Sequence, residues 1–151
     1  MQEKPTYELD ELLKGVKPET VSDYLKDNRQ FLADPKREFC YYMRNVIESK
    51  GILYKDVYSF AGVTESWGSK IISMEKHTKN RDLILRLCIA ARFTLDEINR
   101  ALKLYGMNPL YSKDKRDAVL IVAINNRKYD FHEIDKLLEE HGMEQISGQD
   151  I

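Results

Sequence analysis

Apolar residues recur at helical spacing along almost the whole chain, and this pattern limits the fold more than any other feature. Between residues 81 and 92, for example, Ile84, Leu87, Cys88 and Ala91 stand at positions i, i+3, i+4 and i+7, on one face of a helix. Seven glycines and four prolines in 151 residues, set against many Leu, Ile, Lys and Glu, also favour helices over sheets. We therefore expect an all-α protein.

Breaks in this pattern divide the chain into parts. Asp34-Pro35 ends the first part, because the residue before a proline is pushed away from helical geometry. The first part should contain the helices Tyr7–Lys14 and Glu19–Leu32. The expected parts are an N-terminal helical extension over 1–35, a central helical domain over 36–93, a C-terminal helical hairpin region over 94–146 packed on it, and a disordered tail over 147–151.

The central domain contains the pattern of a helix-turn-helix. Its expected helices are Lys36–Lys50, Tyr54–Ala61, Glu65–Glu75 and Arg81–Arg92. The second and third are joined by Ala61-Gly62-Val63-Thr64, in which Gly62 allows a positive φ and Thr64 can cap the following helix. Ala61 is small where the two helices approach, and Val63 can fill the core between them. In a helix-turn-helix, the helix after this turn presents its N-terminal side chains to the DNA major groove.

An internal repeat marks the C-terminal region. The segment 94–107 reappears as 130–143 at an offset of 36 residues, with matched Glu-Ile and Gly-Met pairs. Arg81-Asp82-Leu83 likewise matches Arg116-Asp117-Ala118 at an offset of 35. Each unit should be a helical hairpin, and two such hairpins can bury their apolar faces against each other.

The helix expected at Lys113–Asn126 is apolar almost all round from Ala118 to Ile124. A helix with this pattern is normally buried on every side. We therefore expect it to be the central buried helix.

Charge is unevenly distributed along a chain whose net charge is only −1. Residues 36–92 carry eleven Lys and Arg against six Asp and Glu, whereas residues 1–35 and 93–151 each have a net charge of −3. A positive segment of this size is the electrostatic pattern expected of a small DNA-binding module. Ordinary variation along a charged chain is the alternative.

The chain resembles the lambda-repressor-like, Cro-type (XRE family) helix-turn-helix regulators from Arg37 to about Phe93. The resemblance lies in the Ala61–Thr64 turn, in Ser69 and Ile71 of the third helix, and in Leu83–Ala91 as the fourth. A looser likeness to the helical tails of some bacterial regulators includes Arg81-Asp82, Leu95–Glu97, Pro109-Leu110-Tyr111 and Lys115–Ala118.

The third helix departs from the family pattern in two places. Gly68 stands where family members usually have a β-branched residue, and Met74-Glu75 comes three residues later than the usual Glu position at Ile72. We expect this helix, over about 64–75, to be either about one turn longer than usual or shifted in register.

The resemblance implies that the third helix lies in the major groove of double-stranded DNA. The candidates for base contacts are Glu65, Ser66, Trp67, Ser69 and Lys70. The candidates for phosphate contacts are Lys55, Lys76, Lys79 and Arg81. An interior aromatic is the alternative role for Trp67, and solvated surface charges are the alternative for the four cations.

Catalytic and cofactor-binding patterns are missing from the sequence. His77, His132 and His141 show no metal-ligand spacing with cysteines, and Cys40 and Cys88 are best explained as two reduced thiols. There is no GxSxG, Walker-type or dinucleotide-binding motif. The first residues are polar and lack the apolar core of a signal peptide. The longest apolar run is too short to cross a bilayer. We expect a cytoplasmic protein that is not an enzyme and has no cofactor, metal or membrane partner.

The alternative function is a helical protein–protein interaction adaptor that keeps the helix-turn-helix fold without binding DNA. The acidic flanks support it, as do Glu65 and Trp67 on the expected reading helix. A homodimer, or a protein partner bound through the C-terminal helices, is compatible with both functions. Tyr105, Tyr111 and Tyr129 lie in those helices, and tyrosine is enriched at interfaces.

Overall fold

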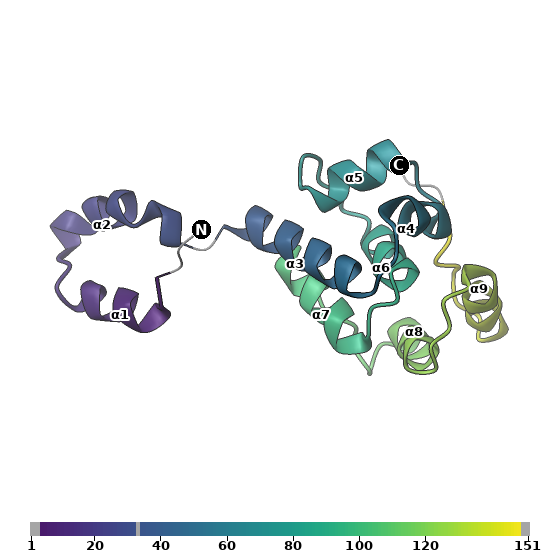
Figure 1. Cartoon of the computed structure of the whole chain (residues 1–151). Coiled ribbons are helices and arrows are strands. Elements are labelled where there is room, and N and C mark those ends of the chain that lie inside the picture. The colour runs from purple at the N-terminus through teal and green to yellow at the C-terminus, as the bar shows by residue number, and fades with distance from the viewer. Residues whose placement is uncertain (1–3, 33, 149–151) are drawn as a thin grey trace. The chain divides into compact units, whose positions relative to one another are not determined.

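The computed structural model describes residues 4–32 and 34–148, and every regular element within them is a helix (Figure 1). The chain divides into two compact units, one reaching to Asp34 and the other beginning at Pro35. Of the tail predicted to be disordered, residues 149–151 lie outside the described residues. Ser147 is described, and its backbone N–H donates to the carboxylate of Asp135. Within these ranges, no helix has the length and apolar character that crossing a bilayer requires.

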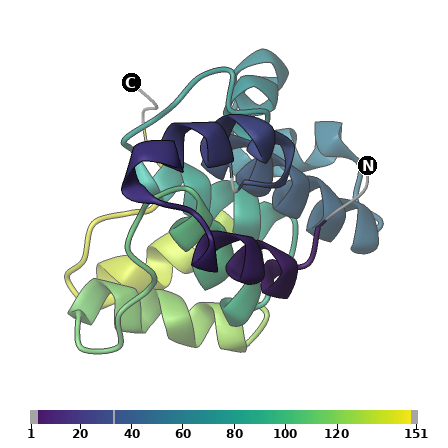
Figure 2. The same cartoon turned by 90° about the vertical axis from the view of Figure 1, so that its left-hand side faces the viewer.

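The N-terminal unit contains two short helices, α1 (Thr6–Lys14) and α2 (Val21–Asp27), and two turns of 3-10 helix at Pro18–Thr20 and Arg29–Phe31 (Figure 1, Figure 2). The prediction of one continuous helix over Glu19–Leu32 is therefore wrong. Asn28 ends α2, because its backbone N–H and its side-chain amide both donate to the carbonyl of Tyr24, at 3.0 and 3.1 Å. An asparagine side chain that bonds the backbone in this way competes with continuation of the helix.

Within the described residues, seven helices form the larger unit. They are α3 (Pro35–Ser49), α4 (Tyr54–Ala61), α5 (Glu65–Ile72), α6 (Arg81–Ala90), α7 (Leu95–Leu104), α8 (Lys115–Asn125) and α9 (Phe131–Glu140). The predicted bounds of α4 are confirmed. The prediction that the third helix continues to about residue 75 is wrong, because Met74 adopts a left-handed conformation with φ of 63° and α5 ends at Ile72.

α6 is the central helix of this unit. Every residue from Leu83 to Ala91 is buried, with α4 and α7 packed against the helix. Arg86 is also buried, and its guanidinium donates to the carbonyl of Ala61 at 2.9 Å and to that of Ile146 at 3.1 Å. Arg86 therefore connects the end of α4 with the C-terminal segment through the middle of the core.

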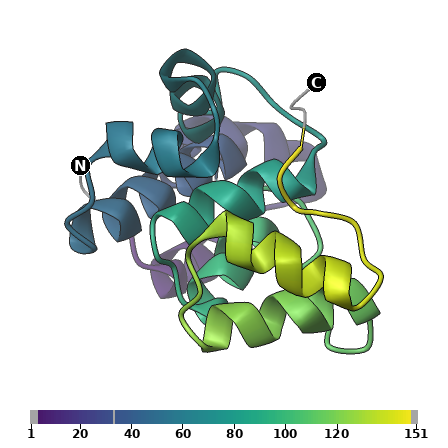
Figure 3. The same ribbon diagram turned by 90° about the vertical axis from the view of Figure 1, so that its right-hand side faces the viewer.

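The prediction that the helix now named α8 is the central buried one is wrong. α8 packs against α9 and α7, and Figure 3 shows α8 and α9, in yellow-green and yellow, side by side. Leu120, Ala123 and Ile124 are buried there, whereas Val122 is 54% exposed. The central position belongs to α6 because α4, which lies far from α8 in the sequence, packs along α6.

The repeat found in the sequence is confirmed as two hairpins, α6–α7 and α8–α9. Backbone features recur in both at equivalent positions: a left-handed residue between the helices (Arg92 and Arg127), a left-handed glycine after the second helix (Gly106 and Gly142), and a backbone N–H that closes that helix (Met107 to Leu102, Met143 to Leu138). Such closures satisfy carbonyls at a helix C-terminus. The two hairpins therefore share one backbone design.

Two ion pairs between equivalent positions join the hairpins. Arg81 of α6 binds both carboxylate oxygens of Asp117 in α8, at 2.8 and 3.0 Å. Arg116 of α8 binds both carboxylate oxygens of Asp82 in α6, at 2.9 Å each. Each arginine also donates to two backbone carbonyls at matching positions, Asn108 and Pro109 for Arg81, Glu144 and Gln145 for Arg116. The exchange is reciprocal, as expected for two copies facing each other.

We expect Asp117→Asn to lower the free energy of unfolding at neutral pH by about 1–2 kcal/mol, because it removes the charge that pairs with Arg81. Burial raises the pKa of Asp117, but hydrogen bonds from Arg81 and from the backbone of Tyr111 outweigh it and leave this pKa below the ordinary 3.8. The stabilisation from the Asp117 carboxylate is therefore complete above the ordinary pKa of 3.8. It is lost as the pH falls through the lower pKa that Asp117 has in the folded protein.

The measurement is urea unfolding at neutral pH and at about pH 2. The wild type should lose more stability on acidification than Asp117→Asn. Asp130→Asn is the matched control, because Asp130 caps α9 and asparagine is an equally good cap. Equal acid sensitivity in the wild type and in Asp117→Asn would contradict the assignment.

Candidate nucleic-acid interface

The turn between α4 and α5 has the local geometry that its sequence predicts. Gly62 adopts φ of 73°, in the left-handed region that favours glycine. Ala61 is buried, and Val63 packs against the core. The hydroxyl of Thr64 accepts a hydrogen bond from the backbone N–H of Trp67 at 3.2 Å and so caps α5. The direction in which α5 leaves the turn is therefore fixed by these four residues.

The five predicted base-contacting residues lie on different sides of α5. Ser66 is exposed and Lys70 is half-buried, and both lie on the side turned away from the buried residues Gly68, Ile71 and Ile72. The short hydroxyl and the long cation stand four residues apart, which places them one above the other on a helix. This side of α5 is available to an external molecule.

Glu65 and Ser69 instead border a groove between α5, α4 and α3. The groove has a volume of about 330 Å³, and Arg44, Tyr54 and Tyr58 also line it. The Ser69 side chain opposes the rise that burial gives to the pKa of Tyr58. Ser69 is itself exposed, on the side of α5 that borders this groove.

Arg44 and Tyr54 are groove residues that the sequence analysis missed. Arg44 lies on the exposed side of α3, and only its charge could have drawn attention to it. Tyr54 donates to the carboxylate of Glu48 at 3.1 Å. Burial, this hydrogen bond and the charge of Glu48 together raise the pKa of Tyr54 to about 12, so it is a neutral donor at physiological pH. The groove therefore holds both signs of charge, from Arg44, Glu48 and Glu65.

Trp67 packs against the core. Its side chain is partly buried, and its indole nitrogen is buried without a hydrogen-bond partner among the described residues. An indole N–H in this position cannot reach a base edge unless the side chain moves. The geometry agrees with the interior role for Trp67.

The position of the Tyr58 ring explains why residue 68 is a glycine. A Cβ atom at position 68 would lie 2.4 Å from Cδ1 and 3.1 Å from Cγ of the Tyr58 ring. The ring of α4 therefore lies directly on the backbone of α5, and the two helices approach closely at this point. The departure from the family pattern at Gly68 is a packing requirement of this pair.

The predicted phosphate contacts fall into two groups, of which the first is formed by lysines. Lys55, Lys76 and Lys79 are exposed, and within the described residues neither these three nor Lys70 make an ion pair. Lys55 lies in the first turn of α4, and the other two lie in the loop between α5 and α6. All three cations are therefore available to an anion.

The loop that carries Lys76 and Lys79 is held in place by Tyr105. The ring of Tyr105 stacks on His77 with centroids 4.6 Å apart, and its hydroxyl accepts the backbone N–H of Thr78 at 2.8 Å. Tyr105 is buried at the end of α7, so it acts within the fold and not at the external interface considered for it. A loop anchored at two adjacent residues presents its lysines in a defined position.

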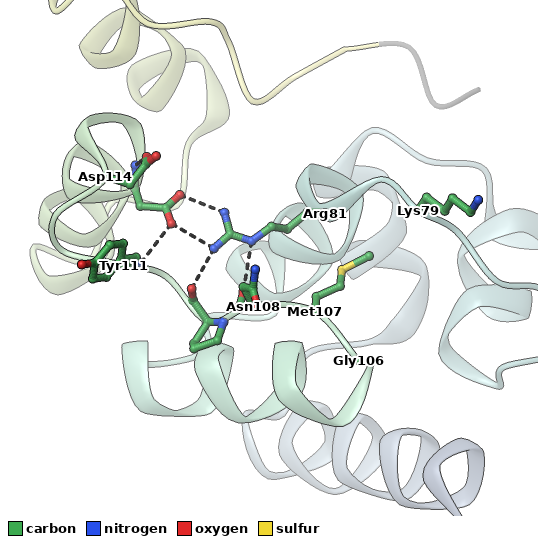
Figure 4. A pocket seen from close by; sticks show the side chains of 9 residues that line it. Lys79, Arg81, Gly106, Met107, Asn108, Tyr111 and Asp114 are labelled. Carbon is green, nitrogen blue, oxygen red and sulfur yellow. Dashed lines mark hydrogen bonds and ion pairs between the residues drawn. The ribbon is translucent and has the colours of Figure 1, made fainter.

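Arg81 forms the second group and differs from the lysines. Its guanidinium is committed to Asp117 and to the carbonyls of Asn108 and Pro109 (Figure 4). Figure 4 also shows that the side chains around it line a pocket, whose volume is about 500 Å³. An arginine with this set of partners serves to join the hairpins. We therefore leave Arg81 out of the candidate interface.

We expect Gly68→Ala to lower the free energy of unfolding by about 2 kcal/mol, because the added methyl group would collide with the Cδ1–Cε1 edge of the Tyr58 ring. In a Tyr58→Ala background the same substitution should raise stability by about 1 kcal/mol, since alanine is the better helix former. Thermal unfolding of the four variants measures this reversal of sign. Gly15→Ala is the control, since its Cβ has only an ordinary contact at 3.8 Å; the same sign in both backgrounds would exclude the clash.

Among the described residues, no three His, Cys, Asp or Glu side chains lie together so that they could hold a metal ion. Comparison of this chain with protein-family models, with curated proteins and with solved structures finds no match. The candidate residues that remain are Ser66 and Lys70 on α5 and the exposed cations Lys55, Lys76 and Lys79.

Proposed function

We propose that this protein is a cytoplasmic, bacterial-type transcriptional regulator that binds double-stranded DNA in a sequence-dependent manner. In this proposal, residues 36–93 form a lambda-repressor-like helix-turn-helix, and α5 enters the major groove. Ser66 and Lys70 contact base edges, since a hydroxyl can donate or accept there and a lysine can bind guanine. Lys55, Lys76 and Lys79 contact phosphates and set the orientation of α5.

The observation that carries the proposal is the set of cations near α5 that have no internal partner. Lys70 lies on α5, and the loop after α5, which carries Lys76 and Lys79, is anchored on Tyr105 through His77 and Thr78. None of these lysines makes an ion pair among the described residues. A protein that binds DNA gains affinity when such cations replace the counterions of the phosphate backbone.

One observation favours the alternative, an adaptor that binds a protein and not DNA. The groove between α3, α4 and α5 contains tyrosines and charges of both signs, and Glu65 borders it at the start of α5. A carboxylate at this place favours the helix N-terminus but disfavours nearby phosphates. In the adaptor, this groove would be the surface that contacts the protein partner. The lysines would then be solvated surface charges.

Fluorescence anisotropy with labelled duplex DNA tests the proposal. The full chain should bind a random duplex pool at low salt, and the affinity should fall steeply as salt increases. Lys70→Ala should weaken binding and relax the preferred sequence at one position, because Lys70 is assigned to a base edge. Lys76→Ala should reduce the slope of log affinity against log salt by up to about 0.9, the value for one phosphate contact. Selection of sequences from the pool should yield a consensus, and Ser66→Ala should relax it at one position.

Lys136→Ala is the matched control, because Lys136 is an exposed lysine on α9, away from α5. It should leave both the affinity and the salt dependence unchanged. An equal effect of Lys70→Ala and Lys136→Ala would place binding elsewhere on the protein. A complete lack of binding at low salt would exclude DNA as the ligand and leave the adaptor function.

A further inference from the structure

The loop between α5 and α6 is held by two different anchors. It forms no regular element, and its two candidate phosphate contacts, Lys76 and Lys79, are exposed. The backbone N–H of Lys76 donates to the carbonyl of Lys70 at 3.1 Å, which ties the first half of the loop to α5 itself. The backbone N–H of Thr78 donates instead to the hydroxyl of Tyr105 at 2.8 Å. The two lysines are therefore placed by different parts of the fold.

Lys79 lies between two residues whose positions are fixed. Thr78 is buried, and its hydroxyl accepts the backbone N–H of Asn80 at 3.0 Å. The side chain of Asn80 in turn caps α6, because it accepts the backbone N–H of Leu83 at 3.3 Å. The backbone position of Lys79 therefore follows from the contact between Thr78 and Tyr105.

The ring of Tyr105 is itself held firmly at the end of α7. It is only 4% exposed, it meets the Phe39 ring of α3 edge-on at 4.7 Å between centroids, and it stacks on His77. The equivalent residue of the second hairpin, 36 positions later, is His141, which is exposed. The hairpin design does not itself require a buried tyrosine here, so the burial of Tyr105 reflects its contacts with the loop and with α3.

We propose that Tyr105 is the positioning residue for the phosphate contact of Lys79, which makes the end of α7 part of the DNA-binding unit. This inference rests on the DNA-binding function proposed above. The helix-turn-helix segment expected from the sequence ends at residue 93, so Tyr105 lies outside it. Arg81, directly after the loop, adds a second tie to the segment after α7, since its guanidinium donates to the carbonyl of Asn108 at 3.1 Å. An ammonium group held in one place loses less freedom on meeting a phosphate than one on a mobile loop.

DNA binding by the full chain carrying Tyr105→Phe tests the proposal. The substitution keeps the ring contacts with Phe39 and His77 but removes the oxygen that accepts the Thr78 N–H. Fluorescence anisotropy should show weaker binding, and the slope of log affinity against log salt should fall by up to about 0.9, the value for one phosphate contact. Hydrogen exchange of the Thr78 amide, which needs no DNA, should become faster because this amide loses its partner.

A double-mutant cycle separates positioning from a general loss of stability. In a Lys79→Ala background, Tyr105→Phe should cause no further loss of slope, because the contact that Tyr105 positions is already absent. In a Lys76→Ala background the two losses should add, since Lys76 is tied to α5 and not to Tyr105. A tyrosine that only stabilised the fold would weaken binding equally in both backgrounds. Additivity with Lys79→Ala would therefore overturn the proposal.

Tyr129→Phe is the matched control, because Tyr129 is a half-buried tyrosine whose ring packs against Arg92 in the connection between α8 and α9. It should change neither the slope nor the exchange of the Thr78 amide. If the wild type binds DNA, an unchanged slope in Tyr105→Phe would overturn this inference alone. A wild type that binds no DNA at low salt would instead overturn the proposed function, and this inference with it.

Discussion

The burial of α6 on all sides is the constraint on which the larger unit depends. This helix has apolar residues on every face, so other helices must enclose it, and α4 and α7 do so. Arg86 is its single charged interior residue. The guanidinium of Arg86 fixes where α4 and the C-terminal segment lie on α6, because it donates to the carbonyls of Ala61 and Ile146. Buried polar groups tolerate little change in geometry. The α4–α5 segment and the C-terminal hairpins are thus held to one common core.

The repeated hairpin explains how a unit of this size is assembled from similar pieces. Equivalent arginines and aspartates cross over between the two copies, so that Arg81 meets Asp117 and Arg116 meets Asp82. Such an exchange needs the two copies to face each other. It also places each arginine next to the backbone carbonyls of the segment that follows the second helix of a hairpin. The two hairpins differ in what covers them. In the first, α4 packs along α6, whereas in the second, Val122 of α8 is exposed.

The candidate interface shows how one short helix divides its residues between tasks. Gly68, Ile71 and Ile72 of α5 are buried in the core, and Trp67 packs at the edge of the core. Ser66 and Lys70 lie on the opposite, outer side of the helix. Glu65 and Ser69 are exposed as well, on the side of α5 that borders the groove. The close approach of Tyr58 to Gly68 places α5 tightly on α4. The proposed contact with DNA depends on the same packing that turns Trp67 toward the core.

Local signals in the sequence determined much of this protein. Helical spacing predicted the helices, Gly62 and Thr64 predicted the turn and the cap, and matched Gly-Met pairs predicted the two hairpins. These features arise from interactions within a few residues, so a short segment is enough to specify them.

Only the tertiary structure decided which helix is central and which charges are free. From the sequence, the helix over 113–126 looked better suited to the centre of the core than the helix over 81–92, but α4 packs along α6, and α6 is the central helix. Arg81 looks like Lys79 in sequence, but Asp117, 36 residues later, occupies its guanidinium. The cover of a face and the partner of a charge come from residues that are distant along the chain, so the folded arrangement, and not the local pattern, determines them.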